Sequence, residues 1–131
     1  MPSTLIEVRC SYTHEQEVRI IEAVQAALVE GFKIPADDRC VRLLAHEPHR
    51  FIVSSSKSQP ERYTVVTVSA FQGRSLDAKR SLYQAIVRNL APLGIPGDCI
   101  MIVLNEIARE NWGLAGGVPG SELDLGFKVN V

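Results

Sequence analysis

Apolar and polar residues alternate along this chain in a pattern that occurs twice. Residues 3–9 have the alternation of a strand, and Thr13-His14-Glu15-Gln16 then resembles a helix capping box. The spacing predicts a helix from about residue 14 to 31, with Gly31 and Pro35 as stop signals. Apolar residues recur at helical spacing through this segment: Val18, Ile21, Val24, Leu28 and Phe32. Residues 39–45 then predict a second strand.

The second half repeats this order. Residues 63–71 are rich in β-branched residues and predict a strand, Ser75 is placed to cap a helix over about 76–92, and residues 99–104 predict another strand. The breaks match as well, because Pro35 and Pro96 stand in similar four-residue segments 61 residues apart. The chain is therefore expected to contain two β-α-β units, with pseudo-repeats at about 1–60 and 61–131.

These units predict an α/β (α+β) fold within a single domain of 131 residues: a four-stranded core sheet with two helices on one face. The strands at 64–71 and 99–104 are apolar on both faces, which suits burial on both sides and predicts a homo-oligomer that closes sheet against sheet. A short strand is predicted at 51–53. The glycine-rich tail from residue 110 is expected to form an arm that reaches a neighbouring subunit, with a hairpin or edge strand at 127–129.

Composition narrows the class of partner. The chain has 14 basic and 15 acidic residues and a formal charge of −1, which argues against nucleic acid as a partner. It has no apolar stretch near 20 residues and no Lys/Arg-led signal peptide, so neither a membrane nor secretion is expected. The three cysteines, Cys10, Cys40 and Cys99, are widely spaced and indicate reduced thiols in the cytoplasm.

No cofactor or metal is expected. His14, His46 and His49 lack the spacing of metal ligands on a regular element. The glycine-rich segment 113–120 contains no Gly-Lys-Ser/Thr and precedes no predicted helix, so it does not resemble a phosphate loop.

Pro2 is the first candidate for chemistry. A methionine followed by a small residue is usually removed during synthesis, and loss of Met1 would leave Pro2 with a free secondary amine. An unperturbed α-amino group titrates near pH 8, so this amine is suited to act as a general acid or base. Alternatively, Pro2 is simply the residue at which a strand begins.

Other candidates follow strands or helices. Arg74 lies between a strand and a helix cap, where it is suited to bind a carboxylate or to remain a solvated loop arginine. Asp37 or Asp38 is suited to hold the Pro2 ammonium or orient a water, although both also fit a simple turn after Pro35. The remaining candidates for substrate binding have structural or solvent-exposed alternatives: Gln72 as a donor, Glu106 at a strand end, and Trp112 as a wall or a packing residue.

Together these segments resemble the tautomerase superfamily, and most of all its malonate semialdehyde decarboxylase group. The matching pieces are Met1-Pro2 before an apolar strand, residues 32–39, Gly73-Arg74-Ser75, and residues 110–113. The resemblance implies a trimer with Pro2 as the catalytic amine, Asp38 as its carboxylate, Arg74 as the cation for a substrate carboxylate and Trp112 as an apolar wall. Where the decarboxylase pattern has a second arginine, this chain has Gln72, which weakens neutralisation of a carboxylate.

The expected function is keto–enol tautomerisation of a small 2-oxo or 3-oxo acid, with Pro2 transferring the proton. A decarboxylase or hydratase acting on a small 3-oxo acid such as malonate semialdehyde is the alternative in the same pocket. A second alternative is a non-catalytic oligomeric binding module, which retention of Met1 would favour because acylation abolishes the basicity of Pro2.

Overall fold

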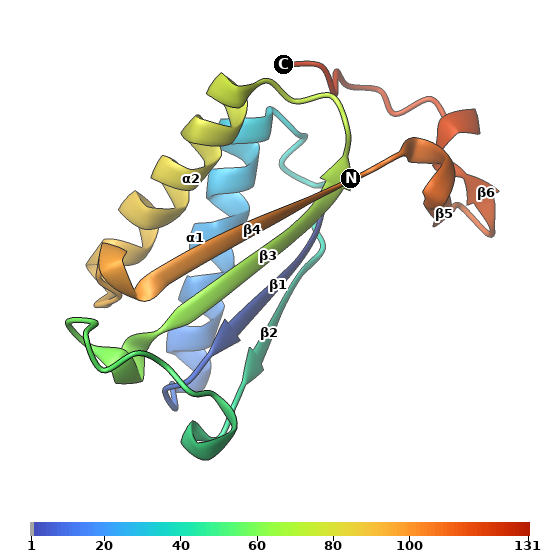
Figure 1. The fold of residues 1–131 in the computed structure, drawn as a ribbon. Coiled ribbons are helices and arrows are strands. Elements are labelled where there is room, and N and C mark those ends of the chain that lie inside the picture. Colours follow the sequence, from blue (N-terminus) through green and yellow to red (C-terminus); the bar gives the residue numbers. More distant parts are fainter. Residues whose placement is uncertain (1) are drawn as a thin grey trace.

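The structure is a computed structural model that describes residues 2–131, and it has a four-stranded sheet with two α-helices on one face (Figure 1). This confirms the predicted fold class. Each half of the chain supplies a strand, a helix and a second strand: β1 (Ser3–Val8), α1 (His14–Phe32), β2 (Val41–Ala45), β3 (Thr64–Phe71), α2 (Leu76–Leu90) and β4 (Ile100–Ile107).

The order of strands across the sheet is β2-β1-β3-β4. The two strands of each half are parallel, and the halves join where β1 runs antiparallel to β3, with Ser3 opposite Ser69 and Thr4 opposite Val41. The beginnings of β1 and β2 therefore lie at the same end of the sheet as the last residues of β3 and β4. This end brings together the chain segments that contain the candidate site residues.

Local signals place both helices. The Thr13 hydroxyl accepts a hydrogen bond from the Gln16 backbone N–H, and the Gln16 side chain accepts one from the Thr13 backbone N–H, so the capping box is confirmed. Ser75 caps α2 by accepting from the Ala78 backbone N–H. Helix α1 ends at Phe32 because Lys33 adopts a left-handed conformation.

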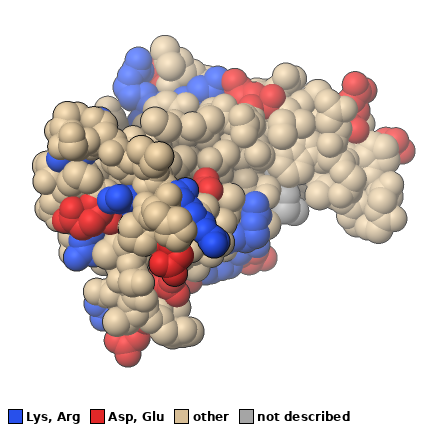
Figure 2. Space-filling view, turned by 60° about the horizontal axis from the view of Figure 1, so that its bottom comes forward, with Lys and Arg blue, Asp and Glu red and all other residues tan. Residues whose placement is uncertain are grey.

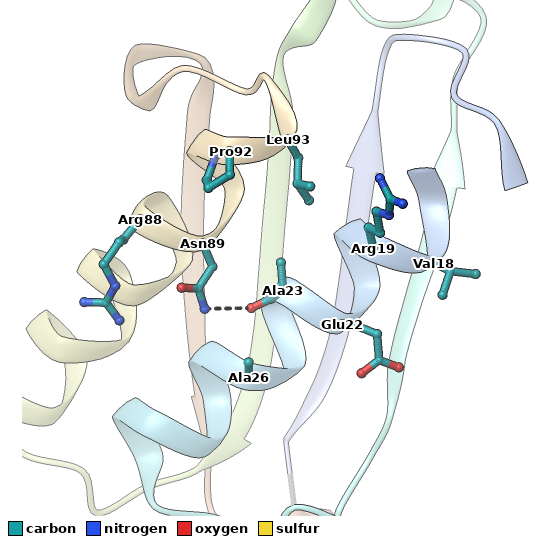
Figure 3. Close-up of a pocket in the computed structure, with 9 residues that line it drawn as sticks. All are labelled: Val18, Arg19, Glu22, Ala23, Ala26, Arg88, Asn89, Pro92 and Leu93. Carbon is teal, nitrogen blue, oxygen red and sulfur yellow. Dashed lines mark hydrogen bonds between the residues drawn. The ribbon is translucent and has the colours of Figure 1, made fainter. Parts of the chain in front are cut away.

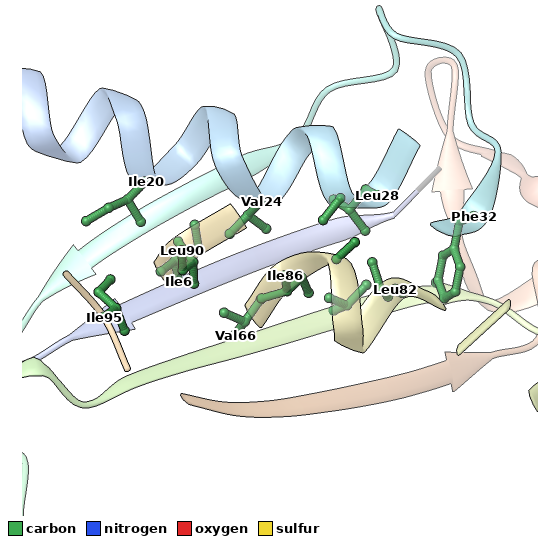
Figure 4. Packing of buried hydrophobic residues seen from close by; sticks show 14 of the residues in the cluster. Ile6, Ile20, Val24, Leu28, Phe32, Val66, Leu82, Ile86, Leu90 and Ile95 are labelled. Carbon is green, nitrogen blue, oxygen red and sulfur yellow. The ribbon is translucent and has the colours of Figure 1, made fainter. Parts of the chain in front are cut away.

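The core lies between the helices and one face of the sheet (Figure 4). Alternate residues of β1 and β3 point toward the helices, and both helices contribute apolar residues three or four positions apart. The largest fully buried side chains include Phe32, Phe71, Ile6, Ile20, Leu28, Leu82, Ile86, Leu90 and Ile95. The core thus fixes α1 and α2 against the strands whose ends form the candidate site.

The opposite face of the sheet is covered by no other element of the described chain. Met101 and Val103 of β4 are 48% and 40% exposed, and Leu44 of β2 is 48% exposed. Leu5 of β1 and Val65 of β3 are half-buried beside them. A row of exposed apolar side chains on an uncovered sheet face is typical of a surface that contacts another protein.

The C-terminal segment differs from the prediction in detail. Its hairpin is formed by β5 (Gly113–Leu114) and β6 (Val118–Pro119). The prediction of a strand at 127–129 is wrong, because that segment pairs with no other strand. That segment instead runs over the turn before α2, where the Ser75 backbone N–H donates to the Val131 carbonyl at 2.8 Å. A side chain at Gly73, whose φ is +129°, would collide with Asn130.

The strand predicted at 51–53 is also wrong. Ile52 is 93% exposed, and the segment pairs with no strand. Its position is held instead by the Phe51 carbonyl, which accepts a hydrogen bond from the Arg9 Nε at 2.7 Å. Ring contacts with His46 and Tyr63 also hold Phe51.

Cys10, Cys40 and Cys99 are free thiols, and Cys99 is buried. Among the described residues, neither helix is long and apolar enough to cross a membrane.

Helices α1 and α2 approach most closely at Gly31, and this predicts a stability effect. A Cβ at this position would lie 2.7 Å from the Leu82 Cα, so Gly31→Ala must separate two backbones. The better helix propensity of alanine contributes about 0.5–1 kcal/mol, whereas overpacking costs about 1–3 kcal/mol. We expect the substitution to lower the free energy of unfolding in urea.

Gly113→Ala is the matched control, because a Cβ there has no neighbour within 4 Å and the backbone is not left-handed. An alanine at position 31 that leaves stability unchanged or raises it would contradict the steric argument.

Candidate functional site

Pro2 lies immediately before β1 and is buried. The register of β1 with β3 pairs Ser3 with Ser69, and its continuation by one residue sets Pro2 beside Ala70. Ala70 is in turn paired with Glu106 of β4. Pro2 is therefore at the end of the sheet, between the start of β2 and the end of β3. Met1 lies outside the described residues, so its removal stays a prediction.

Asp38 is presented by the turn that leads from α1 toward β2. Its backbone N–H donates to the Pro35 carbonyl at 3.0 Å, and its carbonyl accepts from the buried Gln25 side chain of α1 at 3.1 Å. The residue is half-buried, whereas Asp37 is exposed. The simple turn that the sequence offers as the structural alternative is present. The same turn places Asp38 at the Pro2 end of the sheet.

Arg74 lies in the link between β3 and α2 and is only 6% exposed. Its guanidinium stacks over the Phe32 ring, with the central carbon 4.6 Å from the ring centroid. One nitrogen, Nη1, donates to the Phe71 carbonyl at 3.2 Å. Among the described residues, its Nε and Nη2 atoms have no hydrogen-bond partner. These two atoms form one edge of the guanidinium, the kind of edge that binds both oxygens of a carboxylate.

The charge on Arg74 is costly where it lies. Burial lowers the pKa of the Arg74 guanidinium below its ordinary value, and the charges of Asp38 and Glu106 act in the opposite direction. An arginine nonetheless stays protonated near neutral pH. The site therefore contains a buried cation with an open hydrogen-bonding edge, which is the requirement for binding a small anion.

Glu106 and Gln72 flank this cation. The Glu106 carboxylate, at the end of β4, accepts a hydrogen bond from the Lys79 Nζ of α2 at 2.5 Å. Gln72 is exposed, and its backbone N–H donates to the Ile107 carbonyl. Their direct contact with a substrate stays a prediction.

Trp112 packs edge-to-face on Phe71, with ring centroids 5.2 Å apart. Its indole Nε1 is buried and has no hydrogen-bond partner among the described residues. Arg109 lies over the same Phe71 ring and donates to the carbonyls of Gly120 and Leu123 at 3.0 and 2.8 Å. These contacts attach the C-terminal arm to the end of β3, next to Arg74.

A hollow of about 500 Å³ lies between this arm and the Asp38 turn. Its apolar lining comes mainly from the arm: Leu114, Leu123, Leu125 and Phe127. Its charged residues are Asp37, Asp38 and Asp124. Neither Pro2 nor Arg74 lines the hollow, but Asp38 does, and the charge of Asp38 acts on the Arg74 guanidinium.

A larger hollow, of about 670 Å³, lies on the helical face between α1 and α2 (Figure 3). The residues around it include Val18, Ala23 and Leu93, and the Asn89 side chain there donates to the Ala23 carbonyl at 3.1 Å. It is wide open to solvent, and none of the candidate residues contributes to it. No group of three or more potential metal ligands occurs in residues 2–131.

The structure brings Pro2, Asp38, Arg74 and Glu106 to one end of the sheet and attaches Trp112 there through Phe71. The sequence did not identify the residues that support them: Gln25 beneath Asp38, Phe32 beneath Arg74, Arg109 as the brace of the arm, and the arm residues of the hollow. Of these, Phe32 stood in the helical pattern but carried no sign that it would contact Arg74. The others required knowledge of which segments meet.

This fold and site define a small protein of duplicated β-α-β units with a buried arginine at one end of its sheet, whose Nε and Nη2 atoms lack a hydrogen-bond partner among the described residues. Residues 38–115, more than half of the chain, match a family model described as tautomerase enzyme. The chain belongs to this tautomerase family.

Similar proteins agree with this membership. A probable tautomerase of Ralstonia nicotianae is 31% identical over 58 residues, which cover 44% of this chain and 81% of that protein. The structure of FG41 malonate semialdehyde decarboxylase inhibited by 3-bromopropiolate is 31% identical, with a TM-score of 0.74 and coverage of 89% and 92%.

More distant structures share the fold. A second malonate semialdehyde decarboxylase, whose structure was related to decarboxylase and hydratase activities, has a TM-score of 0.81 at 21% identity and coverage of 89% and 93%. Native fused 4-OT has a TM-score of 0.82 at 18% identity and coverage of 92% and 98%.

The unsatisfied edge of Arg74 predicts that this residue is retained for binding and not for stability. Among the described residues Arg74 forms no ion pair and only one hydrogen bond, so an apolar side chain of similar size removes a desolvation cost without leaving a buried partner charge unpaired. We expect Arg74→Met to leave the free energy of unfolding within about 1 kcal/mol of the parent value or to raise it. It should also abolish the rise in melting temperature that a small carboxylate such as propionate gives the parent protein.

Arg88→Met is the control, because Arg88 is an exposed residue paired with Glu30 on the helical face. It should lose at most about 1 kcal/mol and keep the response to propionate. Marked destabilisation by Arg74→Met would instead assign Arg74 a structural role.

Proposed function

We propose that this protein catalyses proton transfer on a small 2-oxo or 3-oxo acid, using Pro2 as the catalytic amine after removal of Met1. The observation that carries the proposal is the unsatisfied edge of buried Arg74 at the end of the sheet where Pro2 precedes β1. A carboxylate bound to Nε and Nη2 would hold the carbon next to its carbonyl group near Pro2. Such positioning is worth several orders of magnitude in rate.

In the proposed keto–enol reaction, the neutral Pro2 amine removes a proton from the carbon next to the carbonyl group. The resulting ammonium then returns the proton to the enolate oxygen, or the reverse sequence operates. Burial of Pro2 suits this role, since taking a cationic amine out of water favours its neutral form. Asp38 is proposed to orient the amine and to stabilise its protonated form when that form is needed.

Trp112 is proposed as the wall of the site and as a donor. Its buried indole N–H has no partner among the described residues, so a substrate oxygen would satisfy it. Gln72 and Glu106 are proposed to contribute at the margin. Gln72 would act as a neutral donor, and Glu106 would fix Lys79 and support the charge of Arg74.

Decarboxylation or hydration of a small 3-oxo acid such as malonate semialdehyde is the alternative reaction. The likeness to a malonate semialdehyde decarboxylase at 31% identity favours it. In this reaction a protonated Pro2 would polarise the carbonyl group and Asp38 would activate water or orient the carboxylate. Gln72 is uncharged, so this chain has less positive charge near the substrate carboxylate than a protein with an arginine at that position.

We also propose that the protein forms a homotrimer. Fused 4-OT, which shares the fold, is described as a trimer. The uncovered sheet face offers the apolar residues Leu44, Met101 and Val103 for such an assembly. We also propose a cytoplasmic location, because the three widely spaced cysteines are free thiols.

Intact mass separates an enzyme from a non-catalytic binding module. Loss of one methionine residue leaves the Pro2 amine free, whereas retention of Met1 would favour the module. In trimmed protein, we expect Pro2→Ala to lower kcat for the enolisation of small 2-oxo acids about 10²-fold or more, the usual contribution of a general acid or base. Its KM should change little, because Arg74 still binds the carboxylate. Equal turnover by the alanine variant would refute the proline mechanism.

The pH–rate profile distinguishes the two chemistries. If Pro2 acts as a base, kcat/KM should rise with pH through the titration of the amine; if it acts as an acid, kcat/KM should fall. Arg74 remains charged throughout this range despite its lowered pKa, so it adds no step near neutral pH. A pH–rate profile that is flat and that Pro2→Ala does not alter would contradict both the base and the acid role of Pro2.

A further inference from the structure

The hollow beside Asp38 has a chemical character that the proposed reaction does not use. Six of its nine lining residues are apolar, and all but Pro35 come from the C-terminal arm: Leu114, Ala115, Leu123, Leu125 and Phe127. Its volume of about 500 Å³ lies in the range of small-molecule pockets. An acid with three carbon atoms would leave most of this space unused.

The charged residues that line the hollow are all acidic. Asp37, Asp38 and Asp124 line it, and no Lys, Arg or His of residues 2–131 is among its lining residues. Figure 2 agrees, because in that view the arm that projects to the right shows acidic side chains and no basic ones. A second carboxylate on a bound acid would therefore meet like charges here, and like charges at a binding surface oppose association.

Asp38 links the hollow to the cation of the site, because its charge acts on Arg74. The Nε and Nη2 atoms of Arg74 are buried and have no hydrogen-bond partner among the described residues, and together they match the two oxygens of one carboxylate. At Gln72, two positions before Arg74, the side chain is neutral and exposed. The site thus has an anion-binding end at Arg74 and an apolar end with negatively charged margins in the arm.

We propose that the substrate is a monocarboxylic oxo acid with an apolar tail, and that the arm hollow binds this tail while Asp124 discriminates against dicarboxylic acids. This inference rests on the proposed function for the role of Arg74. It adds the orientation of the substrate: carboxylate on Arg74, carbonyl group near Pro2, and tail between Leu125 and Phe127.

The arm is held in the position that this binding requires. Arg109 donates to the carbonyls of Gly120 and Leu123, which precede the lining residues Asp124 and Leu125. At the far end, the Val131 carbonyl accepts from the Ser75 N–H directly after Arg74. The tail-binding wall is therefore attached at both ends to the part of the chain that contains the carboxylate site.

A matched pair of acids tests the proposal. In 5-methyl-2-oxohexanoate an isopropyl group replaces the distal carboxylate of 2-oxoglutarate with nearly the same shape. Trp112 is the only tryptophan of the chain and packs on Phe71, so its fluorescence reports binding without turnover. We expect the trimmed protein to bind the apolar acid at least tenfold more tightly than 2-oxoglutarate. Along pyruvate, 2-oxobutanoate and 2-oxohexanoate, affinity should rise about threefold for each methylene group.

Two substitutions in the hollow test whether its residues cause this preference for the apolar acid. Asp124→Asn should reduce the ratio of the two affinities about threefold by improving binding of 2-oxoglutarate, since an exposed charge is partly screened. Leu125→Ser should reduce the ratio by weakening the apolar acid. Asp98→Asn, the same chemical change before β4 at the opposite end of the sheet, should leave the ratio unchanged.

The outcomes separate this inference from the proposed function. Equal or tighter binding of 2-oxoglutarate, absence of binding by all the acids, or a ratio that neither hollow variant changes would overturn the tail-binding proposal. If instead the apolar acids bind in the expected order but none is turned over by trimmed protein, the proposed proton transfer fails and the inference about the hollow stands.

Discussion

Removal of the Arg74 guanidinium from water is the constraint on which this end of the molecule depends. A buried cation is tolerated only where its surroundings compensate for lost hydration. Here the compensation comes from the Phe32 ring, the Phe71 carbonyl and the charges of Asp38 and Glu106. These groups belong to the end of α1, the end of β3, the turn before β2 and the end of β4. The ends of three elements and the turn before a fourth must therefore meet at one place, where the Nε and Nη2 atoms of Arg74 remain without a hydrogen-bond partner among the described residues.

The antiparallel junction of the two halves makes this convergence possible. Within each half the two strands are parallel. Pairing of these strands alone would bring together only segments of the same half. Because β1 runs against β3, the start of the chain lies beside the end of β3 and the loop that contains Arg74. A proline that begins the first strand thus has access to residues encoded more than 30 positions later. The arm then closes the site, because Gly73 lacks the side chain that would collide with Asn130.

Local and repeated features of the sequence predicted the fold well, and contacts between distant segments limited the rest. The helices followed from apolar spacing and from the Thr13 and Ser75 caps, which depend on neighbours within four residues. Residues 51–53 and 127–129 have strand-like composition, but a strand also needs a free edge to pair with, and composition does not reveal one. Pro2, Asp38 and Arg74 could be nominated from the family resemblance. Their supports, such as Gln25 beneath Asp38 and Arg109 beside Phe71, could not, because nothing local marks them.

Arg74 is the one buried arginine among residues 2–131, and this bears on the choice between the two proposed reactions. In tautomerisation the carboxylate is retained, so its interaction with Arg74 persists from bound substrate to transition state and serves to position the acid. In decarboxylation the bound carboxylate leaves as carbon dioxide, and a cation that grips it stabilises the ground state more than the transition state. That reaction needs positive charge at the carbonyl oxygen instead, where the electrons accumulate. With Gln72 neutral and Lys79 engaged by Glu106, that charge would have to come from a protonated Pro2. The arrangement around Arg74 therefore favours a reaction in which the carboxylate stays bound and only a proton moves.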